Sequence, residues 1–130
     1  MIAADVSAPE GCCGAANVIA DWIFRGAGQR DNRQLGDALD GLGLHRSGGI
    51  NTAHITIGAA LESSNLSEAI ELYGDIVLRA ELGDEQFAPA RQLAIDGVKG
   101  LDDDPRHKVM LKVREQFYPP PLGRRALGLS

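Results

Sequence analysis

The sequence predicts only two β-strands among five helices, and this shortage of strands most limits the folds open to the chain. Residues 50–61 alternate in polarity, as a half-buried strand does. Residues 44–46 are expected to pair with them across a Ser-Gly-Gly turn at 47–49. The apolar face of the longer strand holds Ala53, Ile55, Ile57, Ala59 and Leu61. Two strands make a marginal sheet, so we expect helices over this face, and further strands that are missing or come from another copy or protein.

Five helices are predicted from apolar spacing and capping signals. Their expected starts are Gly14, the Asp31-Asn32 pair, the Ser63-Ser64-Asn65 run, Asp84 and Asp104-Pro105. The first ends near Phe24, the second ends at Gly43, and the prolines at 119–121 stop the fifth. The fold class that follows is α+β, with helices packed on an antiparallel sheet.

Each helix carries an apolar stripe that we expect to be buried. In chain order the stripes are Ala15, Val18, Ile19, Trp22 and Ile23; Leu35, Leu39 and Leu42; Leu66, Ala69, Ile70, Tyr73 and Val77; Phe87, Leu93, Ala94, Val98 and Leu101; Val109, Met110, Val113 and Phe117.

Charge and hydropathy exclude several function classes. The formal net charge is −5 over 130 residues, and no basic stripe is present, so a nucleic-acid partner is not expected. No run of about 18 apolar residues predicts a membrane span. Residues 1–10 lack the pattern of a signal peptide, which favours a cytoplasmic location.

The cysteines and glycines give no sign of a cofactor. Cys12 and Cys13 are adjacent, so we interpret them as two reduced side chains before the first helix; a metal or redox role would need further Cys or His nearby. Gly14, Gly26 and Gly28 do not form a dinucleotide fingerprint, because no strand precedes them. No nucleophile elbow, phosphate-binding loop or Ser-His-Asp order is present, and no cofactor is expected.

The histidines and one acidic run leave two interpretations open. If Ser47 pairs with Ile50, His45 lies opposite Thr52 and diagonal to His54, so a two-histidine metal site is conceivable but lacks a third ligand. The alternative is that both face solvent or line a chamber. His107 is expected to be exposed in a first helical turn. The acidic run 102–104 either attracts cations or serves the helix start, where acidic residues are favourable.

Six segments, in order, resemble the N-terminal half of a known peptidase domain. They are GAANVIADWIFRG at 14–26, LG at 42–43, NTAHIT at 51–56, LESSNL at 61–66 with DI at 75–76, DDP at 103–105, and PLGR at 121–124 with Gly128. Together they resemble the pitrilysin family of zinc peptidases, which includes insulysin and the mitochondrial processing peptidase. The resemblance covers about residues 14–128 and implies a truncated, two-layer α/β sandwich domain over 14–130, after an irregular segment at 1–13.

The resemblance also shows which catalytic residues are absent. The family's helix reads G-x-x-H-x-x-E-H-x-x-F-K-G, in which two histidines bind zinc and the glutamate is the general base. The matching positions here are Asn17, Ala20 and Asp21, and a later glutamate ligand falls at about Asp96 or Gly97. Carboxylates and an amide suit harder cations than zinc, and alanine cannot act as a base. We therefore expect no catalytic residues, no metal and no peptidase activity.

Four functions follow from this reading as hypotheses. The first is a non-catalytic partner, scaffold or chamber-wall subunit, because one half-domain of such peptidases often lacks the zinc motif and supplies substrate contacts. Its companion would be an active chain of the family or a second copy. The second is a stand-alone peptide-binding module that adds a peptide strand to its sheet edge. The others are a zinc endopeptidase fragment with residual metal binding and a fragment without separate function.

Overall fold

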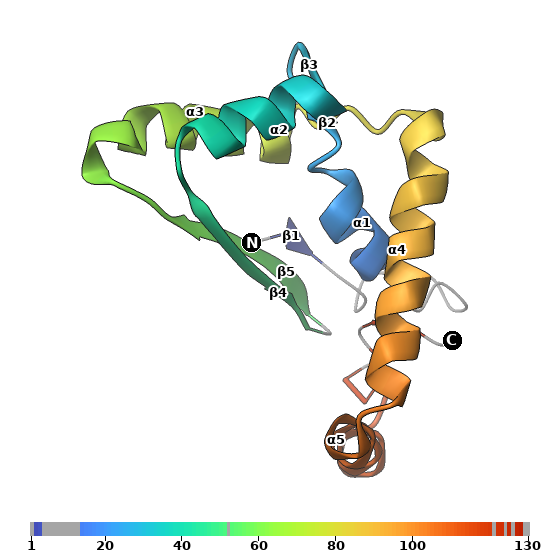
Figure 1. Cartoon of the computed structure of the whole chain (residues 1–130). Coiled ribbons are helices and arrows are strands. Elements are labelled where there is room, and N and C mark those ends of the chain that lie inside the picture. The colour runs from blue at the N-terminus through green and yellow to red at the C-terminus, as the bar shows by residue number, and fades with distance from the viewer. Residues whose placement is uncertain are drawn as a thin grey trace.

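A computed structural model of the chain describes residues 2–3, 14–51, 53–120, 122–123, 125 and 127–128. Its elements in chain order are β1 (Ile2–Ala3), α1 (Ala15–Trp22), β2 (Gly26–Ala27), β3 (Arg30–Asp31), α2 (Asn32–Gly41), β4 (His45–Ile50), β5 (His54–Ala60), a 3₁₀ turn (Ser63–Asn65), α3 (Leu66–Leu78), α4 (Asp84–Asp102) and α5 (Pro105–Phe117). Figure 1 shows α2 and α3 side by side beyond one end of the β4–β5 hairpin, with α1 against α4 and α5 beyond the far end of α4.

The predicted helix starts hold at α2 and α5, where local side chains fix them. Asp31 accepts a hydrogen bond from the backbone N–H of Gln34, and the Gln34 side chain accepts one from the N–H of Asp31, which makes a capping box. Asp104 accepts from the N–H of Arg106, with Pro105 as the first residue of α5. At α4 the cap is Gly83 rather than the predicted Asp84. Asp84 lies inside the first turn, where its negative charge interacts favourably with the helix dipole.

The predicted register of the hairpin is wrong. Ser47, Gly48 and Gly49 are strand residues of β4, and the chain turns between Asn51 and His54 instead. The side chain of Asn51 accepts hydrogen bonds from the N–H groups of Ala53 and His54, and its own N–H donates to the His54 carbonyl. This turn, which the Asn51 side chain closes, forms in place of the turn predicted at residues 47–49. Gly48 also suits a close strand approach, since a Cβ there would lie 2.8 Å from the Thr56 carbonyl oxygen.

The main sheet has the order β1-β5-β4, and all its pairs are antiparallel. β1 pairs Ile2 with Ile55 and Ala3 with His54, so part of the segment predicted as irregular is a strand. β2 and β3 form a second two-stranded sheet between the first two helices, which the sequence did not predict. The α+β fold class, with helices on antiparallel strands, is confirmed.

The core lies between α1, α2, α3 and the hairpin. Leu35, Leu39 and Leu42 of the second predicted stripe are all buried, as expected. A smaller contact between Ala16 of α1 and Ile55 of β5 holds the first helix on the sheet. The whole buried set is Ala16, Ile23, Ala27, Leu35, Leu39, Leu42, Ile55, Ala69, Leu72, Ile76 and Ala90.

Three predicted stripes are corrected by the structure. In α3 the buried side is Ala69, Leu72 and Ile76, whereas Leu66 and Ile70 are 50% and 63% exposed. In α4 the buried residue is Ala90, while Phe87 and Leu93 are exposed. In α5 the whole predicted stripe is exposed: Val109, Met110, Val113 and Phe117. These helices have more apolar surface than the rest of the described chain can cover.

Several predictions fall outside the described residues: those on residues 4–13 with Cys12 and Cys13, on Thr52, on Pro121, and on Arg124. The Asp102 side chain is likewise not described. Among the described residues, every helix is too short or too polar to cross a lipid bilayer.

Candidate functional site

The residues that match the family's zinc helix line a groove between α1 and the hairpin. The groove encloses about 520 Å³. Its α1 wall carries Asn17, Ala20 and Asp21, and its opposite wall is β4 and the start of β5. The full lining is Asn17, Ala20, Asp21, Phe24, Arg46, Ser47, Gly48, Gly49, Ile50, Ile55, Thr56, Ile57 and Leu127.

Asn17 lies at the position of the family's first zinc-binding histidine, and its side chain links α1 to α4 and to Leu127. Its Nδ2 donates to the Ala94 carbonyl at 3.4 Å and to the Leu127 carbonyl at 3.3 Å. One turn earlier Gly14 has a φ of +90°, and a Cβ there would lie 2.7 Å from the Gly128 Cα. The start of α1, the middle of α4 and residues 127–128 therefore meet at this side chain.

Ala20 has no side chain that could act as a base, and the Asp21 carboxylate is not free to bind a metal ion. Ala20 has no titratable group and packs against the small core cluster around Ile55. The Asp21 carboxylate accepts a hydrogen bond from Arg25 Nε at 2.6 Å, one helical turn along α1. Because the guanidinium satisfies this carboxylate, binding a cation there would require breaking the pair.

Asp96 does not join the groove. Its carboxylate accepts from Gln92 at 2.9 Å and lies 4.0 Å from Lys99 Nζ, and its side chain is 58% exposed. Ala94, two residues earlier, is the part of α4 that meets Asn17. Residues two apart on a helix point about 200° from each other, so residue 96 faces away from α1. Within the described ranges, no three His, Cys, Asp or Glu side chains gather as a metal site.

The two histidines of the hairpin are separated, which removes the proposed two-histidine site. His45 pairs with Ala60, whereas His54 pairs with Ala3 at the other end of β5. Six residues of strand separate these positions, or about 20 Å. His54 Nε2 lies 3.1 Å from the Asn51 amide nitrogen, so it belongs to the turn.

An aromatic and cationic cluster at the groove edge was not predicted. The Arg46 guanidinium lies 5.6 Å from the centre of the Phe24 ring, and Phe24 meets Tyr73 edge-on at 6.2 Å. Tyr73 donates a hydrogen bond from its hydroxyl to the Gly58 carbonyl. Burial raises the pKa of Tyr73, and the positive charge of Arg46 acts in the opposite direction. No ion pair of Arg46 is present in the described part of the chain. No pattern in the sequence predicts this contact, since it depends on the hairpin register.

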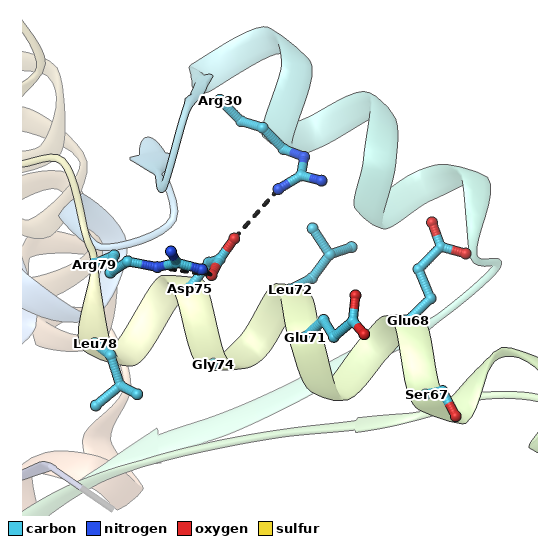
Figure 2. A pocket seen from close by; sticks show the side chains of 9 residues that line it. All are labelled: Arg30, Ser67, Glu68, Glu71, Leu72, Gly74, Asp75, Leu78 and Arg79. Carbon is cyan, nitrogen blue, oxygen red and sulfur yellow. Dashed lines mark hydrogen bonds and ion pairs between the residues drawn. The ribbon is translucent and has the colours of Figure 1, made fainter.

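A second concavity, of about 760 Å³, lies along α3. Figure 2 shows Arg30 of β3 and Arg79 converging on Asp75, which is the aspartate of the DI segment. Arg30 Nη1 lies 3.3 Å from Asp75, whose side chain is only 14% exposed. Gly28 has a φ of +66°, and a Cβ there would lie 2.9 Å from an Asp75 oxygen. Because Asp75 occupies both guanidinium groups, this cluster is a structural link between β3 and α3.

Comparison with known proteins agrees with the resemblance seen in the sequence. The chain is 25% identical over 118 residues to an uncharacterized zinc protease of Rickettsia bellii and 23% identical to one of Rickettsia felis. Each alignment covers 90% of this chain but only 29% of the relative. A solved peptidase M16 inactive domain from Pseudomonas fluorescens matches with a TM-score of 0.74 and 18% identity, covering 98% of this chain and 32% of that one. No protein-family model matches the sequence.

These findings identify the type of protein fold that the chain has. The chain has the fold of a peptidase M16 domain, and its predicted resemblance to pitrilysin-type zinc peptidases is confirmed. It spans less than a third of the length of the relatives that it matches.

Proposed function

We propose that the chain is a non-catalytic homologue of a pitrilysin-type peptidase that acts as a partner, scaffold or chamber-wall subunit. The main support for the proposal is what the side chains at the positions of the family's zinc ligands contact in this chain. Asn17 bonds to two backbone carbonyls, Asp21 pairs with Arg25, and Asp96 faces away from both. The side chains at the positions that would hold zinc in an active relative are here bonded to other groups of the chain.

The surrounding scaffold supports a retained role. The capping box of α2, the Asp104 cap of α5 and the Asp75 link between two arginines are all in place. Random decay would damage such features as readily as a metal site. Retention of the scaffold beside a lost site favours a protein that is kept for its surfaces.

Co-purification tests the proposal. A tagged chain is purified gently from its native host, and proteins present in near-equal amount are identified. We expect a companion that carries an intact H-x-x-E-H motif, and peptide cleavage that needs both chains. Isolation of the chain alone, as a monomer or homodimer, contradicts a partner role.

Zinc content provides a second check that does not need the companion. We expect well under one equivalent of zinc after dialysis at neutral pH, because no three metal-binding side chains gather among the residues that the structure describes. One tightly held equivalent, together with cleavage by the chain alone, would show an active zinc peptidase.

The groove itself favours a second candidate, a peptide-binding module. The outer edge of β4 has no strand partner among the described residues, and the groove beside it is partly apolar. Arg46 gives this groove a positive charge that suits an acidic side chain. Binding of extended acidic peptides to the isolated chain, weakened by Arg46→Gln but not by Arg33→Gln on exposed α2, would support it.

A further inference from the structure

We draw no further inference here: the strongest candidate, the apolar groove of about 740 Å³ along α5 that Met110, Val113 and Phe117 line, carries none, because nothing in the part of the chain that the structure describes shows what covers it.

Discussion

At Leu35 the side chain has no contact with solvent, and it packs in the core cluster with Leu39, Leu72 and Ile76. Leu35→Ala is expected to lower the free energy of unfolding by about 2–5 kcal/mol, from lost transfer free energy and a residual cavity. Urea denaturation measures this loss. Leu78→Ala, the same change at an 82% exposed position, should alter the free energy of unfolding by less than about 0.5 kcal/mol. Similar losses for both variants would place Leu35 outside the core.

Tyr73 gives the folded chain a specific sensitivity to alkali. Burial raises its pKa above the ordinary value of 10.0, while Arg46 acts in the opposite direction. The folded chain therefore favours the neutral phenol. This contribution to stability is fully present below pH 10 and is lost as the pH rises through the raised pKa, because the unfolded chain ionises first.

Tyr73→Phe separates this effect from other alkaline transitions. The substitution removes the hydrogen bond to Gly58, so at neutral pH we expect a loss of about 1 kcal/mol. From about pH 10 upward, the difference in unfolding free energy between wild type and variant should shrink, since the variant has no phenol to ionise. Thermal unfolding from pH 7 to 11 measures it. A difference that stays constant with pH would show that Tyr73 ionises equally in both states.

At the scale of the element, the start of α2 depends on one side chain. Asp31→Ala breaks the capping box and is expected to cost about 1 kcal/mol. Asp37→Ala on the same helix is the control, because its carboxylate lies 3.9 Å from Arg33 and both side chains are exposed. Chemical denaturation of the two variants makes the comparison. A larger loss at Asp37 would contradict the assignment of the helix start.

Sequence patterns predicted those elements whose signals are local. Asp31 and Asp104 mark helix starts through bonds to residues at most three positions away. The hairpin register was mispredicted, because the glycines at 48–49 are a good turn signal and the competing turn depends on the orientation of the Asn51 side chain. The small β2–β3 sheet was missed, since two-residue strands give no periodicity.

Burial was harder to predict, because apolar spacing marks one face of a helix without showing what packs against it. The stripe of α5 has helical spacing, yet each of its four members is more than half exposed. The candidate site shows the same limit. The positions that match the family's zinc motif were identified from the sequence, but the solvent-facing orientation of Asp96 and the contact of Arg46 with Phe24 required the structure.

The exposed stripe of α5 yields a prediction about stability. Val113→Gln with Phe117→Gln should change the free energy of unfolding by less than about 0.5 kcal/mol for each substitution, because these side chains are 54% and 74% exposed. Binding of a hydrophobic dye to the folded chain should fall, since apolar surface is removed. Strong destabilisation would mean that the stripe is covered in solution.

At the scale of the whole molecule, the relation of α1 to α4 determines whether a zinc site can be rebuilt. Asn17→His with Asp21→His puts two imidazoles one turn apart on α1, the spacing that an inverted zincin uses. A third protein ligand must then come from α4. Asp96 faces solvent and pairs with Gln92 and Lys99, whereas Ala94 meets Asn17. At residue 96 the side-chain orientation, and not only the substituted motif, opposes a closed site.

Adding Asp96→Glu to the two histidine substitutions tests this orientation. All variants carry Cys12→Ser and Cys13→Ser, so that thiolates do not compete for zinc. We expect the glutamate to change the zinc dissociation constant by less than about twofold, well below the tenfold that corresponds to about 1.4 kcal/mol. Calorimetric titration with zinc measures both constants. Tightening by tenfold or more would mean that residue 96 reaches the groove and that α4 is turned differently against α1.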